Sequence, residues 1–255
     1  MPPRLPKEFL DAPLAHRALH DVSDGRPENS IAAVKAAIDA GYGIEVDVQL
    51  SADAQAMVFH DYALARLAEA EGLVKEHSSV ALANIPLRGG AEGVPTLQDV
   101  LSVIDGQVPV LIEIKDQDGQ MGEGVGPLER SVAAALSGYS GPVAVMSFNP
   151  NSVKLMAALL PDVPRGLVTD AFDPTHWDLP EHVCAPLRKI EAYEAVGATF
   201  ISHDCRDLER ARVAELKASG ADILCWTVRS PQQEAQARKI AENITFESYL
   251  APLGA

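Results

Sequence analysis

The stretch GIEVDVQLSADAQAMVFHD, residues 43–61, contains two apolar runs that are typical of β-strands. Side chains alternate between the two faces of a strand, so Glu45 and Asp47 share one face, while the valines beside them share the other. The second run ends on His60. Carboxylates inside an otherwise apolar strand predict that this strand carries a polar site as well as part of the hydrophobic core.

Similar apolar runs recur along the chain and alternate with segments of helical periodicity. Ser30 and Thr96 are typical helix N-caps, and Gly41 is typical of a helix end. The expected strands are residues 13–16, 44–48, 108–115, 142–148, 165–169, 199–204, 222–228 and 244–247, and the expected helices are residues 31–41, 97–104, 128–136, 151–160, 187–196, 207–219 and 231–242.

Eight strands with intervening helices predict a TIM-type (β/α)8 parallel barrel, an α/β fold. A doubly wound open sheet is the alternative, but no glycine-rich phosphate fingerprint follows the first strand. We expect residues 1–255 to form a single barrel domain. Residues 62–94 are irregular for one βα step, which indicates a small insertion after the second strand.

The composition limits the partners and the compartment. The chain has 255 residues, 47% of them hydrophobic, with 21 Lys and Arg against 36 Asp and Glu, giving a net charge of −15. Such a surface repels nucleic acid and anionic lipid. No apolar run approaches the ~20 residues that a transmembrane helix needs. The first residues lack the apolar core of a signal peptide, and the three cysteines are widely spaced, so we expect a cytoplasmic protein with reduced thiols.

Polar side chains gather at the expected strand ends, where the carboxyl face of a parallel barrel carries its chemistry. They are His16, Arg17, Glu45, Asp47, His60, Glu113, Lys115 and Trp226. Converging carboxylates repel one another and need a cation, and oxygen ligands without cysteine favour one divalent ion, Mg²⁺ or Ca²⁺. Two histidines suit an acid and a base, and the Arg and Lys suit an anion, so together these groups predict displacement at a phosphate.

Each assignment has a structural alternative. Glu45 and Asp47 could form interior salt bridges with Arg17 and Lys115. His16 and His60 could be ordinary core histidines, and Trp226 could be core. His203 lies at another strand end, where capping or packing is the simpler interpretation.

The order of short motifs resembles the glycerophosphodiester phosphodiesterase family, a parallel βα barrel with a small insertion after the second strand. The matching pieces are His16-Arg17, Pro27-Glu28-Asn29-Ser30, Glu45-Val46-Asp47, His60-Asp61, Pro95-Thr96-Leu97, Glu113-Ile114-Lys115 and Trp226-Thr227-Val228. The resemblance implies that Glu45, Asp47 and Glu113 bind the metal and that His16 and His60 form the acid–base pair. It further implies that Arg17 and Lys115 hold the phosphate and that Glu28 orders the first loop beside the metal.

Three departures from the family pattern stand out. Ala18 and Ala54 occupy positions where the family usually has glycine, and the final strand lacks the frequent Thr-Asp ending. None of them removes a catalytic group.

The expected activity is metal-dependent hydrolysis of a small glycerophosphodiester to glycerol 3-phosphate and an alcohol. A lysophospholipase D-type phosphodiesterase and a non-catalytic phosphodiester-binding barrel are the alternatives. The head group, the choice of ion and the oligomeric state stay open at this point.

Overall fold

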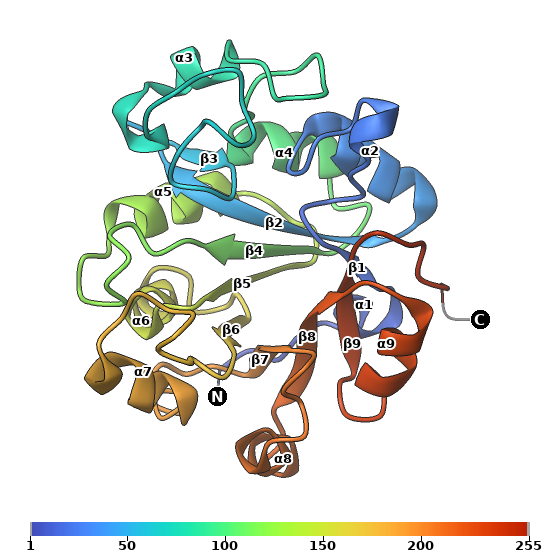
Figure 1. Ribbon diagram of the computed structural model, residues 1–255, viewed down its shortest axis with the longest axis vertical. Coiled ribbons are helices and arrows are strands. Elements are labelled where there is room, and N and C mark those ends of the chain that lie inside the picture. The colour runs from blue at the N-terminus through green and yellow to red at the C-terminus, as the bar shows by residue number, and fades with distance from the viewer. Residues whose placement is uncertain (1, 254–255) are drawn as a thin grey trace.

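The computed structural model describes residues 2–253, and they form the predicted parallel barrel (Figure 1). Each barrel strand pairs in parallel with the next, and β1 pairs with both β2 and β9, which closes the sheet. The barrel strands are β1 (Leu14–Ala15), β2 (Gly43–Leu50), β4 (Val110–Ile114), β5 (Val143–Ser147), β6 (Arg165–Thr169), β7 (Phe200–Asp204), β8 (Asp222–Val228) and β9 (Asn243–Phe246).

Helices follow the barrel strands, and two of the expected caps are present. Ser30 Oγ accepts the amide of Ala33, and Thr96 forms a reciprocal cap with Asp99. The helices are α1 (Glu8–Asp11), α2 (Ile31–Ala40), α4 (Leu97–Ile104), α5 (Pro127–Leu136), α6 (Pro150–Leu159), α7 (Glu181–Arg188), α8 (Ala211–Ala218) and α9 (Pro231–Ala237).

The prediction of a helix at residues 187–196 is wrong. The helix in this region is α7, which begins six residues earlier and tolerates Pro186 in its interior. It ends because Ile190 has a left-handed backbone with φ of 51°, which no helix can continue. Helices α8 and α9 are also shorter than their expected ranges, because their flanking residues form turns.

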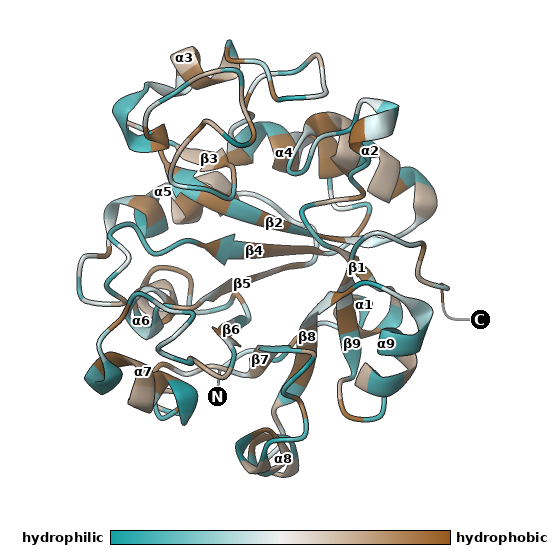
Figure 2. Cartoon of the chain, viewed as in Figure 1, coloured by the Kyte–Doolittle hydropathy of each residue, from teal (hydrophilic) through white to brown (hydrophobic). Residues whose placement is uncertain are grey.

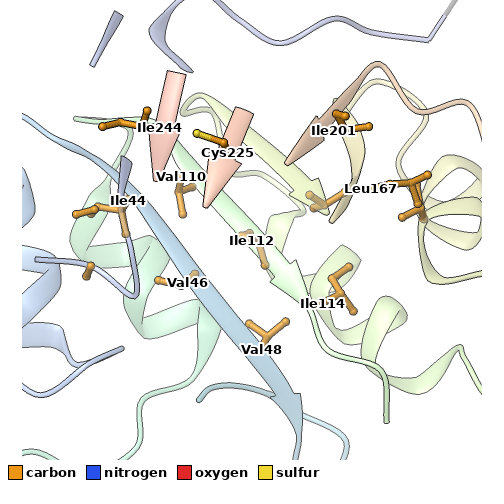
Figure 3. Close-up of a cluster of buried hydrophobic side chains, with 14 of the residues drawn as sticks. Ile44, Val46, Val48, Val110, Ile112, Ile114, Leu167, Ile201, Cys225 and Ile244 are labelled. Atoms are coloured by element: carbon orange, nitrogen blue, oxygen red, sulfur yellow. The ribbon is translucent and has the colours of Figure 1, made fainter. Parts of the chain in front are cut away.

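The core has two layers, one on each face of the barrel wall. Residues that point outward pack under the helices, as Val46 of β2 and Ile112 of β4 do (Figure 3). Residues that point inward fill the barrel, with Phe9 of α1 packed among them. At the carboxyl end of the strands this inward layer becomes polar, and β4 turns from brown to teal there in Figure 2.

The segment after β2 forms a substructure beside the barrel. Strand β3 (Ala56–Val58) pairs antiparallel with β2, and the chain continues through a 3₁₀ turn, η2 (Val74–Glu76), and α3 (Ser79–Ala83). These elements share their own hydrophobic cluster, which includes Phe59, Leu64 and Leu82. The segment lies at the top of Figure 1, far from α8. Between residues 2 and 253, no helix is long and apolar enough to cross a membrane.

Candidate active site

Three carboxylates meet at the carboxyl end of β2 and β4. Asp47 pairs with Glu113 across the two strands, and Glu45 lies two residues before Asp47 on the same inward face. One oxygen from each of the three side chains lies within 4.8 Å of the others, and all three residues are buried. The alternation of side chains along the strands, which the sequence predicted, therefore brings the three carboxylates together.

Two cations lie against this cluster, as the salt-bridge interpretation anticipated. Lys115 Nζ lies 2.8 Å from Asp47 Oδ1 and 2.6 Å from Glu113 Oε1. Arg17 Nε lies 3.5 Å from Asp47 Oδ2. Burial raises the pKa of Asp47, but the positive charge of Lys115 and the other cationic groups nearby outweigh it and hold that pKa well below its usual range. Asp47 is therefore a carboxylate that stays ionised.

Glu45 is the member of the cluster that these cations leave least satisfied. Its Oε2 accepts the backbone amide of Arg17 at 2.9 Å, but its buried Oε1 has no hydrogen-bond partner. Burial, followed by the charges of Asp47 and Glu113, raises the pKa of Glu45 well above its ordinary value. An unpartnered buried oxygen in an all-carboxylate donor set fits a hard divalent cation, so Glu45, Asp47 and Glu113 could hold one together.

Both predicted histidines stand at this mouth with a carboxylate behind the ring. His16 Nδ1 lies 2.6 Å from Glu247 Oε2, and His60 Nδ1 lies 2.6 Å from Asp61 Oδ1. Burial lowers the pKa of His16, while its bond to Glu247 works in the opposite direction. A carboxylate at Nδ1 favours the Nδ1–H tautomer, which leaves Nε2 as the atom that can exchange protons.

Arg66 of the insertion ties the first loop to His60. Its guanidinium donates to both oxygens of Asp61, at 2.6 and 2.7 Å, and to both oxygens of Glu28, at 3.1 Å each. Glu28 in turn accepts Arg17 Nη1 at 2.6 Å. The sequence analysis placed Glu28 in the first loop, and the structure shows which cations it contacts there.

Three functional candidates escaped the sequence analysis: Glu247, Asp61 in its contact with His60, and Arg66. Asp61 directly follows His60, so the adjacent pair could have indicated this contact from the sequence. Glu247 lies 231 positions from His16, and only closure of the barrel between β9 and β1 brings them together. Arg66 belongs to no motif that the sequence shows, and one of its partners, Glu28, lies 38 positions away.

The opposite side of the mouth is aromatic. Trp226 of β8 donates its Nε1–H to the carbonyl of Ser202, and its ring meets that of Phe148 edge to face at a centroid distance of 5.6 Å. Trp177, from the loop after β6, lies 5.2 Å from Phe148 and 5.0 Å from Phe172 by the same measure. Phe148, Trp177 and Trp226 are half-buried, and we call these three the aromatic wall.

Two features lie on the outer side of β6. A cavity of about 330 Å³ is lined mainly by apolar groups, among them Met121, Phe148 and Leu187. No stretch of the sequence indicated it. His203 is fully buried there, with Nδ1 2.7 Å from Thr169 Oγ1 and Nε2 3.3 Å from Asp207. Its contacts therefore agree with the packing interpretation.

Comparisons with known proteins agree with one another. Residues 16–243 match the model of the glycerophosphoryl diester phosphodiesterase family. The chain is 28% identical to YhdW of Bacillus subtilis over 88% of each chain, and 29% identical to a glycerophosphodiester phosphodiesterase of Caldanaerobacter subterraneus subsp. tengcongensis over 84% of each. The structure is similar to that of an Oleispira antarctica phosphodiesterase solved with its product sn-glycerol-3-phosphate, with a TM-score of 0.77, 23% identity and 94% of each chain covered.

The family match spans most of the chain, and the fold agrees with that of the solved phosphodiesterase. The chain is therefore a phosphodiesterase that belongs to the glycerophosphoryl diester phosphodiesterase family.

Proposed function

We propose that this protein hydrolyses small glycerophosphodiesters to glycerol 3-phosphate and an alcohol. One observation carries the proposal: His16 and His60, each with a carboxylate at Nδ1, stand at the same barrel mouth as three buried carboxylates. A phosphodiester needs one proton removed from the attacking oxygen and one given to the departing alkoxide. Two histidines with Nε2 available can divide these tasks, whereas a binding barrel has no use for them.

Glu45, Asp47 and Glu113 are the residues that would hold one divalent ion, Mg²⁺ or Ca²⁺. The unpartnered Glu45 Oε1 and the oxygen-only donor set support this assignment. A bound ion would supply positive charge for a phosphate oxygen in the transition state. In the metal-bound protein Lys115 would be freed from part of its contact with these carboxylates and could turn to the substrate.

Arg17 and Lys115 are the cations that would hold the phosphate. Both side chains are largely buried, so their charges act in a medium of low polarity where they attract an anion more strongly than in water. Glu28 would keep Arg17 in place by accepting Nη1, and Arg66 would keep Glu28 in place. Trp226 would contact the organic part of the substrate from the aromatic wall.

The direct test is release of glycerol 3-phosphate from glycerophosphoethanolamine, measured with a coupled dehydrogenase, in Mg²⁺, Ca²⁺ and chelator. We expect turnover with a divalent ion and none with chelator. Glycerol 3-phosphate itself should inhibit competitively without releasing phosphate, because it lacks a second ester. Phosphate release from glycerol 3-phosphate at a comparable rate would refute the diesterase assignment.

A lysophospholipase D-type activity is the second candidate, and the cavity beside Phe148 is the observation that favours it. An acyl chain needs an apolar channel, and this cavity is lined in part by Phe148, a member of the aromatic wall. The discriminating measurement is kcat/KM for a lysophospholipid against glycerophosphoethanolamine under one metal condition. A higher value for the lysophospholipid would make it the preferred substrate class.

We further propose that residues 1–255 act as one catalytic domain in the cytoplasm, without nucleic acid as a partner. Cys184, Cys205 and Cys225 are free thiols, which suits a reducing compartment. The net charge of −15 disfavours a polyanion.

A further inference from the structure

Glu247, the carboxylate behind His16, has three basic neighbours. Its Oε2 lies 2.6 Å from His16 Nδ1, and its Oε1 accepts Arg229 Nε at 2.7 Å. His20 Nε2 lies 3.8 Å from Oε2, the same oxygen that His16 uses. Two histidines therefore flank one oxygen of this carboxylate, and an arginine holds the other.

His20 is the neighbour that is left without a bond. Its Nε2 is buried and has no hydrogen-bond partner among residues 2–253, a situation that costs about 1–3 kcal/mol for a buried polar atom. A distance of 3.8 Å is too long for a hydrogen bond. A small rotation of the Glu247 carboxylate would bring Oε2 within reach of His20, and the same rotation would take it away from His16. The two histidines therefore compete for one oxygen.

The backbone around Arg229 is held by hydrogen bonds on both sides. The carbonyl of Val228, directly before it, accepts the amide of Glu247 at 3.0 Å, which ties the chain after β9 to the end of β8. The amide of Arg229 itself donates to Gln233 Oε1 at 2.7 Å, in the first turn of α9. Between residues 2 and 253 Glu247 is the sole salt-bridge partner of Arg229. The guanidinium therefore reaches Glu247 from a fixed part of the backbone.

The surroundings of Glu247 keep its side chain ionised. Burial raises the pKa of Glu247, but the two histidines and the charge of Arg229 outweigh it and hold that pKa well below its usual range. Arg17 and Asp47 are the other charged groups that face His16. An ionised carboxylate only accepts hydrogen bonds, so each of its neighbours must offer an N–H. Which histidine does so depends on the direction in which Oε2 points.

We propose that Arg229 is a positioning residue for the reaction: by binding Oε1 of Glu247, it holds Oε2 on His16 and away from His20. The inference rests on the proposed diesterase function. The terminal torsion of a glutamate side chain is broad, so the carboxylate rotates easily unless a second contact fixes it. With Oε2 fixed, His16 keeps its proton on Nδ1 and presents Nε2 for proton transfer. Without Arg229, His20 would take Glu247 in a fraction of the molecules, and His16 would lose its orientation there.

The activity test compares Arg229→Gln with the wild type in the hydrolysis of glycerophosphoethanolamine under one metal condition. We expect kcat to fall about tenfold, a part of the 10²- to 10⁴-fold contribution of a positioned acid or base, with KM nearly unchanged. Arg229→Lys should restore part of the loss. Arg238→Gln is the matched control and should keep the wild-type kcat. Arg238 also binds a glutamate, Glu234, through Nε at 2.7 Å, but it lies beside Asn243 at the amino end of β9.

His20→Leu gives the sharper test, because it removes the competing histidine. Added to Arg229→Gln, it should raise kcat severalfold, since Oε2 of Glu247 then has only His16 to bind. In the wild type, where Arg229 already holds the carboxylate, the same change should raise kcat little or not at all. In Glu247→Gln protein, Arg229→Gln should cause no further loss, because the two residues act through one contact.

A measurement without substrate separates this inference from the proposed function. Nitrogen NMR of the histidine side chains reports which ring nitrogen carries the proton, and His16→Ala identifies the signals of His16. We expect His16 to carry its proton on Nδ1 in the wild type and in Arg238→Gln. In Arg229→Gln we expect a mixture of the two ring forms.

The outcomes are distinct. An unchanged kcat in Arg229→Gln, or a loss that His20→Leu does not reduce, would overturn the positioning role. A rise in KM at constant kcat would also overturn it, because Arg229 would then be a substrate contact. If the wild type hydrolyses no glycerophosphodiester, the proposed function fails instead, and the NMR measurement decides. A mixture of His16 ring forms in Arg229→Gln alone would support the inference, and the same form in all three proteins would refute it.

Discussion

The two sides of the barrel mouth carry side chains of different chemistry, although the strands of one barrel position both. On the side of β1, β2, β4 and β9, charged side chains pair with one another at short distances, as Lys115 does with Asp47 and Glu113. On the side of β5 to β8, the ring of Phe148 packs against those of Trp177 and Trp226. Phosphate chemistry needs charges held at fixed positions, whereas recognition of an alcohol needs shape and a weak electrostatic preference.

We call the side of β1, β2, β4 and β9 the ionic side. The largest expected effect on activity is there, at Glu45. Glu45→Gln should lower kcat more than about 10³-fold, because a bound cation contributes several kcal/mol to the transition state. In chelator the same variant should melt at a higher temperature than the wild type. The ionised Glu45 opposes folding there, since burial and its neighbours raise its pKa. The measurements are steady-state kinetics and thermal unfolding.

Glu8→Gln is the matched control, because Glu8 is exposed in α1, which lies at the opposite, amino end of the barrel strands. It should change neither activity nor stability. Full activity of metal-free protein would contradict the metal assignment.

The next effect concerns the two histidines. His16→Ala and His60→Ala should each lower kcat by about 10²- to 10⁴-fold, the usual contribution of a positioned acid or base. The double variant should lose less than the product of the two, because groups that act as a unit are not additive. His182→Ala, at an exposed position, is the control. If either single variant keeps a kcat near that of the wild type, that histidine is an ordinary core residue and not an acid or base.

A smaller effect should show that the insertion supports the ionic side. Arg66→Ala should lower kcat about tenfold, because Asp61 and Glu28 lose their shared partner and the groups they hold become misplaced. Arg66→Lys should restore part of this loss. Arg88→Ala is the control: Arg88 also belongs to the insertion but donates only to the carbonyl of Ala65. Equal effects of Arg66→Ala and Arg88→Ala would mean that the insertion contributes stability alone.

On the aromatic side the expected effect is on binding. Trp226→Leu should raise KM about fivefold and leave kcat nearly unchanged, because the lost contact exists in the ground state as well as in the transition state. A fall in kcat with constant KM would mean that Trp226 contributes to the transition state, as the groups of the ionic side do. It would contradict the assignment of binding to one side of the mouth and catalysis to the other.

The smallest effect concerns the first loop, where Ala18 has a left-handed backbone with φ of 64°. Ala18→Gly should raise the free energy of unfolding by about 1 kcal/mol, because an L-residue is strained in this region and glycine is not. Ala54→Gly, where φ is 60°, should give a similar gain outside the mouth. Denaturant titration measures both. A loss of activity in Ala18→Gly alone would show that the strain holds Arg17 in place.

Two of the three departures from the family pattern lie at these same backbone angles. The two positions where glycine is usual, Ala18 and Ala54, both have positive φ in this chain. The sequence revealed the departure, but only the backbone showed that each alanine occupies a conformation that favours glycine. The missing Thr-Asp ending also has a structural counterpart, because Glu247 supplies the carboxylate that meets His16.

The sequence by itself determined the barrel, the inward face of β2 and the carboxylates on it, because alternation of side chains and of strands with helices is a local property. It misplaced α7, which contains Pro186 in its interior. Only the tertiary structure decided that Glu247 serves His16, that Arg66 joins Asp61 to Glu28, and that Phe148, Trp177 and Trp226 form one wall. These contacts join segments far apart in the chain, and they arise only when the barrel closes and its loops meet at one mouth.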